Sequence, residues 1–169
     1  MAVLETANFN GSNGSHFYIE LQYVLSSQDA AEVESTVTYY LYAGASGGYS
    51  GSGAALNGYI NGTLVGSTTS IGKNGRVLLG TLTETIPHEE DGTCSPSYSA
   101  SASAPWTGLG SASLSGVYSL PPIAVKNNSL YLKVDDVWKK GSLYIKIDGV
   151  WKKGTPYLKA NGTWEKSSS

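Results

Sequence analysis

Apolar and polar residues alternate with a period of two along most of residues 16–120, a pattern that predicts half-buried β-strands. The residues expected to face the core in the first two strands, within 16–25 and 35–42, are Phe17, Ile19, Leu21, Tyr23, Leu25, Val37, Tyr39 and Leu41. The best local helix candidate is the short segment 29–34, and it lies between strand-like segments. We therefore expect an all-β protein.

Turn signals divide this region into short strands. Asn61-Gly62 predicts a tight hairpin, because both central residues of such a turn need a positive φ. Serines alternate with small apolar residues over 94–104, so we expect a close approach between neighbouring strands or sheets. A final strand over 111–120 ends at Pro121-Pro122. About seven strands at this spacing favour an immunoglobulin-like antiparallel β-sandwich over residues 16–122.

The last third of the chain repeats itself, as SLYLKVDDVWKKG, SLYIKIDGVWKKG and TPYLKANGTWEKS. Each copy reads as two short strands around a two-residue turn, at Asp135-Asp136, Asp148-Gly149 and Asn161-Gly162. We predict three domains: a polar N-terminal arm at 1–15, the sandwich, and a small array of three 13-residue β-hairpin repeats at 123–169. A lone hairpin is marginal in water, so the copies must pack on each other, on the rest of the chain or on a partner.

Composition narrows the function classes. Charged residues make up 14% of the chain, well below the usual quarter, and the C-terminal repeat is basic whereas the first part is acidic. No electrostatic footprint for nucleic acid is present. The single cysteine, Cys94, excludes an intrachain disulfide and a cysteine zinc site. We expect no signal peptide at residues 1–17 and no membrane insertion, since apolar runs are short.

The charged corner from His88 to Asp91 is the clearest candidate for catalysis or metal binding. Its spacing fits no established zinc or EF-hand pattern, so we interpret it as a solvated corner where Asp91-Gly92 turns the chain; a calcium ion remains the alternative. His16 and the many serines lack a G-x-S-x-G elbow. We therefore predict no enzyme, no catalytic residues, no metal site and no cofactor.

Aromatic side chains are the candidate binding residues. Rings with a polar handle suit carbohydrate or protein contacts, but they also serve as packing for a sandwich edge or an oligomer interface. Both interpretations stay open for the two repeat series, spaced 13 residues apart, and for the sandwich aromatics. The candidates are Tyr40, Tyr42, Trp106, Tyr131, Trp138, Tyr144, Trp151, Tyr157 and Trp164.

Several motifs resemble a known family. They are Ser27-Gln28, Ser35-Thr36-Val37, the Ile60-Asn61-Gly62 turn, and His88 followed by Asp91-Gly92-Thr93 and a run of alternating small residues. Together they resemble the immunoglobulin-like module of minor structural proteins from tailed bacteriophages that infect Gram-positive bacteria, and the C-terminal repeat is similar to repeats in such tail proteins. The segment Ala31 to Glu34 departs from the family, which commonly has an asparagine-rich loop there.

The resemblance implies a non-enzymatic virion protein of the tail, fibre or baseplate, assembled in the host cytoplasm and contributing to host attachment. Its implied partners are other virion proteins, further copies of itself as a homo-oligomer, and bacterial cell-wall saccharide. A capsid decoration protein or head fibre is the alternative within the virion. A free carbohydrate-binding module is the alternative from another class.

Overall fold

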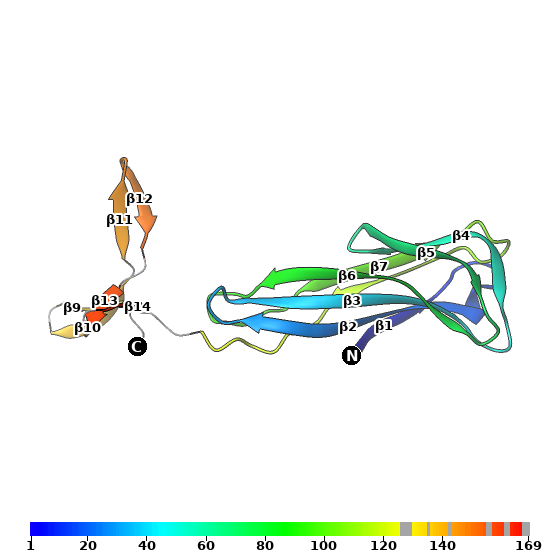
Figure 1. Ribbon diagram of the computed structural model, residues 1–169, viewed down its shortest axis with the longest axis horizontal. Helices are drawn as coiled ribbons and strands as arrows, with labels where there is room; N and C mark the ends of the chain where they lie inside the picture. Colours follow the sequence, from blue (N-terminus) through cyan, green and yellow to red (C-terminus); the bar gives the residue numbers. More distant parts are fainter. Residues whose placement is uncertain (126–129, 135, 142, 155–156, 161–162, 167–169) are drawn as a thin grey trace. The chain divides into compact units, whose positions relative to one another are not determined.

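The structure, a computed structural model, forms two units, Met1–Ile123 and Ala124–Ser169 (Figure 1). It describes residues 1–125, 130–134, 136–141, 143–154, 157–160 and 163–166. Over these ranges every regular element is a strand apart from one turn of 3₁₀ helix, η1 (Gly14–His16). None of the described residues belongs to a helix able to span a membrane. The all-β prediction is confirmed.

The first unit consists of two four-stranded antiparallel sheets. In one sheet the strands lie in the order β1 (Ala2–Asn8), β2 (Phe17–Asp29), β3 (Glu34–Ala45) and β6 (Arg76–Pro87). The order in the other is β5 (Thr63–Ile71), β4 (Gly51–Ile60), β7 (Ser97–Ser103) and β8 (Ser111–Val117). The chain moves between the sheets after β3, β5 and β6, which is a β-sandwich with Greek-key connections.

The pairing of these strands matches the immunoglobulin arrangement. In that fold strands A, B and E share one sheet, while C′, C, F and G share the other. Here β2, β3 and β6 take the places of A, B and E, and β5, β4, β7 and β8 take those of C′, C, F and G. β1 adds a further strand beside β2, and among the described residues none forms a strand in the place of D.

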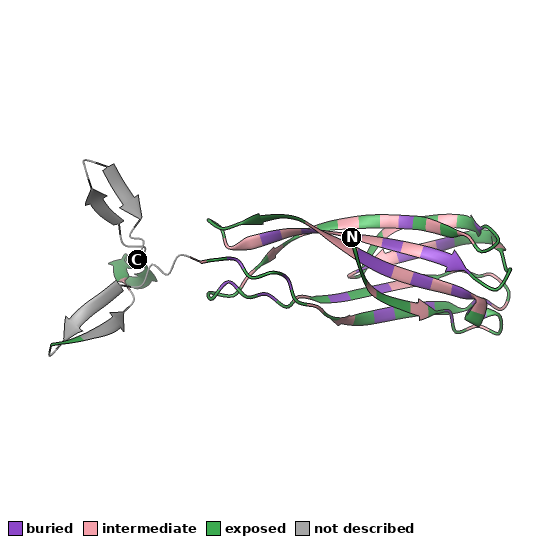
Figure 2. Ribbon diagram, turned by 90° about the horizontal axis from the view of Figure 1, so that it is seen from below, coloured by how far each residue is buried: buried purple, intermediate pink, exposed green. Residues whose placement is uncertain are grey.

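The core follows from the alternation of side chains along each strand. Val37, Tyr39 and Leu41 of β3 are 0% exposed, and their neighbours in sequence are half-buried on the outer face (Figure 2). On β7, Ala100 and Ala102 face the core while the serines face outward. The inward alanines are small, so large side chains of the opposite sheet can reach β7.

Two glycines allow the sheets to meet at one edge. A Cβ at Gly66 of β5 would lie 2.0 Å from the carbonyl oxygen of Leu79, and one at Gly80 of β6 would lie 2.1 Å from that of Val65. The two backbones therefore touch where β5 and β6 pass each other. Any side chain at either glycine would force the strands apart.

The prediction of a polar N-terminal arm at residues 1–15 is wrong. Residues 2–8 pair with β2 in an antiparallel register, so they form the edge strand β1, and the segment after it folds into η1. The sequence hides this strand because its central residues alternate weakly and most of them are exposed on the sandwich edge. Backbone hydrogen bonds to β2 place it there, and these leave no side-chain pattern.

The second unit contains three antiparallel hairpins. They pair β9 (Leu130–Val134) with β10 (Val137–Gly141), β11 (Tyr144–Ile147) with β12 (Val150–Lys153), and β13 (Tyr157–Ala160) with β14 (Thr163–Lys166). At the second turn, Asp148 and Gly149 have φ of 49° and 84°, as a type I′ turn requires. Residue 135 and the turn at 161–162 lie outside the described residues.

Candidate functional site

One hollow opens where three connections of the sandwich meet, and we call it the tryptophan pocket. The connections are residues 9–16 between β1 and β2, 46–50 between β3 and β4, and 104–110 between β7 and β8. Its volume is about 360 Å³. The residues that line it are Asn13, Phe17, Tyr49, Ser50, Gly51, Ser52, Trp106, Thr107 and Leu109.

Trp106 is held in a fixed orientation within this pocket. Its indole Nε1 donates a hydrogen bond of 2.6 Å to the carbonyl oxygen of Ala54. A Cβ at Gly51 or Gly53 would lie 2.7 or 2.8 Å from the indole ring, so the ring fits only because both positions are glycine. The strand β4 thus fixes a half-buried ring whose polar edge is already satisfied.

Tyr49 also lines the tryptophan pocket and is 43% exposed. Its ring stacks on His16, with centroids 3.6 Å apart and planes at 7°. Its loop is tied to the β5–β6 turn, because Gly48 N donates to Asn74 Oδ1 at 2.7 Å and Asn74 N donates to the Tyr49 carbonyl at 3.1 Å. The glycine-rich loop is therefore anchored at its tip.

The third wall of the pocket is held by backbone hydrogen bonds. Gly11 N donates to the Leu109 carbonyl at 2.9 Å, and Asn13 N donates to the Gly108 carbonyl at 2.8 Å. These bonds join two connections that are about a hundred residues apart in sequence, and Asn13 and Leu109 from these connections both line the pocket. The pocket thus combines apolar rings with amide and hydroxyl groups, a composition typical of small-molecule sites.

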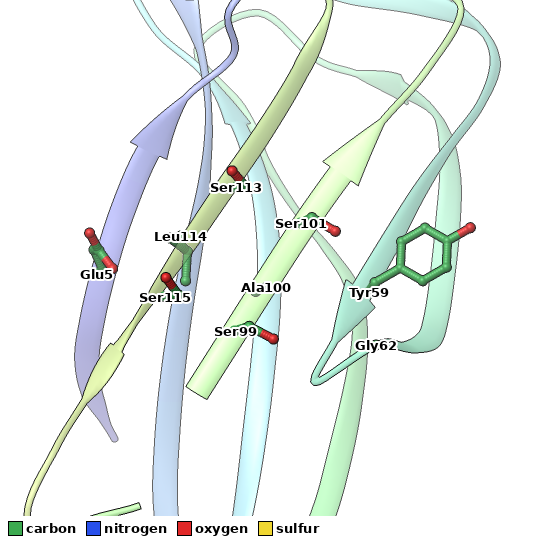
Figure 3. Close-up of a pocket in the computed structure, with 9 residues that line it drawn as sticks. All are labelled: Glu5, Tyr59, Gly62, Ser99, Ala100, Ser101, Ser113, Leu114 and Ser115. Atoms are coloured by element: carbon green, nitrogen blue, oxygen red, sulfur yellow. The ribbon is translucent and has the colours of Figure 1, made fainter. Parts of the chain in front are cut away.

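A second hollow, the serine groove, lies along β7 and β8 and has a volume of about 540 Å³. Ser99 pairs with Ser115 and Ser101 with Ser113 across the two strands. Figure 3 shows these hydroxyl groups between Glu5 of β1 and Tyr59 of β4. The serine groove offers one aromatic ring and four serine hydroxyl groups, whereas the tryptophan pocket is lined by three aromatic rings.

The structure places Tyr40 and Tyr42 away from both hollows. They are half-buried on the outer face of β3, as the alternation predicted. The face of the Tyr42 ring is covered by the Arg76 guanidinium at 3.6 Å, and Arg76 forms a 2.9 Å ion pair with Glu20. Of the three sandwich aromatics predicted from sequence, Trp106 lines one of these two hollows and Tyr40 and Tyr42 line neither.

In the hairpin unit, Tyr144 and Trp151 are 53% and 65% exposed. The side chains of the other four predicted rings, Tyr131, Trp138, Tyr157 and Trp164, lie outside the described residues, although their backbones are in strands.

The charged corner at 88–93 is a structural turn. Gly92 has a φ of 83°. Thr93 donates to Asp91 Oδ1 from its hydroxyl at 2.6 Å and from its backbone nitrogen at 2.9 Å, and these two bonds hold the pKa of Asp91 below its usual range. His88 Nδ1 donates to the Gly92 carbonyl at 2.7 Å, so Nε2 accepts from the buried hydroxyl of Ser35 at 2.7 Å. Over the described part of the chain no group of three or more metal-ligating side chains gathers.

Sequence reasoning missed Tyr49, Phe17 and Asn13 as pocket residues. Tyr49 gave a usable signal, since it is the one aromatic in the Gly/Ser-rich segment 44–53. Phe17 occupies a core-facing position in the period-two pattern, so the sequence gives no sign that it also lines the pocket. No protein-family model, curated protein or solved structure matches this chain.

Proposed function

We propose that this protein is a non-enzymatic structural component of a phage virion, associated with the tail, fibre or baseplate, and that it contributes to attachment by binding saccharide on the host surface. The resemblance of the motifs between Ser27 and Thr93 supports the virion part of the proposal. The tryptophan pocket supports the binding part. We assign saccharide recognition to that pocket.

The observation that carries the binding proposal is the composition of the pocket. Trp106 and Tyr49 supply two flat rings for the apolar faces of a sugar, and Asn13, Ser52 and Thr107 supply polar groups for its hydroxyls. Both rings are held by contacts within the protein, so little side-chain entropy is lost on binding. The serine groove lacks this pairing of rings.

The position of the pocket agrees with this assignment by analogy of fold. The connections 46–50 and 104–110 correspond to the B–C and F–G loops, which carry recognition in antibody variable domains. Such loops can vary without disturbing the core, because a rigid sandwich holds their ends. The analogy concerns position alone.

The test compares substitutions of the exposed Tyr49 and the half-buried Tyr59 in the full chain. Tyr49→Ala removes one ring of the tryptophan pocket, whereas Tyr59→Ala removes the ring of the serine groove. We expect Tyr49→Ala to weaken binding to isolated Gram-positive cell-wall polysaccharide about three- to tenfold, and Tyr59→Ala to leave it unchanged. Loss with Tyr59→Ala alone would move the site to the serine groove.

Virion incorporation is tested separately by immunogold labelling of phage particles. Label on the tail supports the proposal, and label on the head would favour a decoration protein. Absence of label, combined with saccharide binding, would make the protein a free carbohydrate-binding module.

A further inference from the structure

The two units carry opposite charge. Residues 124–169 contain nine lysines and four acidic residues, a formal charge of +5, whereas residues 1–123 contain two basic and nine acidic residues, a charge of −7. A polyanion is therefore attracted to the hairpin unit and repelled by the sandwich.

The hairpin of β11 and β12 shows how its lysines are arranged. Tyr144 pairs with Lys153 and Lys146 pairs with Trp151, and residues two apart on a strand share a face, so these four side chains lie together. The Lys146 ammonium lies 5.8 Å from the Trp151 ring centroid. This distance allows a cation–π contact that keeps a positive charge beside an exposed ring.

The opposite face of this hairpin has a different character. Ile145, Ile147 and Val150 occupy it and are 50%, 46% and 59% exposed, together with Lys152. One face is therefore aromatic and cationic, and the other is mainly aliphatic. Only the first combines a flat ring with a charge for a ligand that has both a sugar ring and an anionic group.

The same cross-strand pairs recur in the other two hairpins. Their backbone registers place a lysine opposite the tryptophan and a second lysine opposite the tyrosine, as in the central hairpin. The pairs are Lys133 with Trp138, Tyr131 with Lys140, Lys159 with Trp164, and Tyr157 with Lys166. The same backbone register in three hairpins of one chain suits a ligand that is itself a repeating polymer, because each further contact then forms at a high effective concentration.

From this repeated pairing we infer that the hairpin unit is a second binding site, and that its ligand is a linear acidic polysaccharide. Each tyrosine–lysine–tryptophan–lysine face stacks on a sugar ring and pairs its ammonium groups with the acidic group of that repeat unit. The inference deepens the proposed function and rests on it in one respect, namely that the host surface is the source of the saccharide. A second copy of the unit is a poorer occupant, since two surfaces of charge +5 repel each other.

The lysines distinguish this ligand from a nucleic acid. The unit contains no arginine, and arginine is the residue that pairs bidentately with phosphate and stacks on bases. Lysine is a compact point charge that pairs with any acidic group, so what the unit lacks for a nucleic acid is the planar guanidinium that stacks on bases.

The experiment measures affinity of the full-length protein for polygalacturonate, with dextran as the uncharged glycan, polyglutamate as the charged polymer without sugar rings, and oligothymidylate as the nucleic acid. We expect polygalacturonate to bind most tightly, and its affinity to fall as the ionic strength rises. The double variant K133Q/K146Q should lower this affinity about five- to tenfold. The matched variant K139Q/K152Q, whose lysines pair with Leu132 and Ile145, loses the same charge and should bind nearly as wild type.

Equal weakening by the two double variants would overturn the inference, since binding would then depend on net charge alone. Equal or tighter binding of polyglutamate or oligothymidylate would also overturn it, and so would absence of polygalacturonate binding. All four lysines belong to strands of the second unit and Tyr49 belongs to the first, so these variants change no residue of the tryptophan pocket. If polygalacturonate binding fails this test while cell-wall polysaccharide still binds, the inference is overturned and the proposed function stands. The proposed function is overturned separately, by the Tyr49→Ala experiment.

Discussion

The hydroxyl groups of Tyr39 and Tyr118 form a partly buried pair that a double-mutant cycle can test. They lie 2.8 Å apart, and the Tyr118 ring also contacts Tyr23, with centroids 4.6 Å apart. Tyr39 is 0% exposed, whereas Tyr118, which follows the last strand of the sandwich, is only half-buried. The pair therefore fastens the end of the sandwich chain to the centre of β3.

The two single variants are expected to lower the free energy of unfolding by different amounts. Tyr118→Phe leaves the fully buried Tyr39 hydroxyl without a partner and should lower the free energy of unfolding by about 1–3 kcal/mol. Tyr39→Phe leaves the Tyr118 hydroxyl, which can still reach water, and should cost about 0.5–1.5 kcal/mol. Removing both hydroxyls leaves no orphan, so the double variant should cost less than the sum of the singles by about 1 kcal/mol.

The measurement is urea unfolding of the full chain, followed by circular dichroism and by hydrogen exchange at β3. One kcal/mol corresponds to a shift in melting temperature of about 3–5 °C for a unit of this size. Tyr40→Phe, on the outer face of the same strand, is the control and should change stability by less than about 0.5 kcal/mol. Strict additivity of the two single variants would refute the coupling, and a larger loss for Tyr39→Phe would refute the assigned burial.

Three further outcomes follow from the same contacts. Gly51→Ala should displace the Trp106 ring, since its Cβ would lie 2.7 Å from that ring, and reduce saccharide binding; Gly72→Ala, with nothing within 4 Å, should not. Gly66→Ala should destabilise the sandwich by about 1–3 kcal/mol in thermal unfolding, because its Cβ would meet a carbonyl oxygen at 2.0 Å. Burial raises the pKa of both paired tyrosines above 10.0, so unfolded chains lose these protons first, and the free energy of unfolding should fall as pH rises above that value. This decline should become shallower in the double phenylalanine variant, where the raised pKa values of Cys94 and Tyr98 still contribute to it. An unchanged decline would assign it to those other groups.

The sequence by itself determined the fold class and most of the core. The period of two places Val37, Tyr39 and Leu41 on one face, and the structure buries all three completely. Alternation predicts burial well because a one-residue slip would expose the whole apolar set. The type I′ turn at Asp148-Gly149 was equally readable, since few residue pairs accept a positive φ at both positions.

Only the tertiary structure decided the position of β1 and the composition of the tryptophan pocket. β1 is placed by backbone hydrogen bonds to β2, which any sequence without proline can form. The pocket joins Asn13, Tyr49 and Trp106, which are far apart in the chain and meet because three connections end on the same side of the sandwich. Local patterns carry no information about such meetings, because Greek-key connections bring distant segments together at the ends of the sheets.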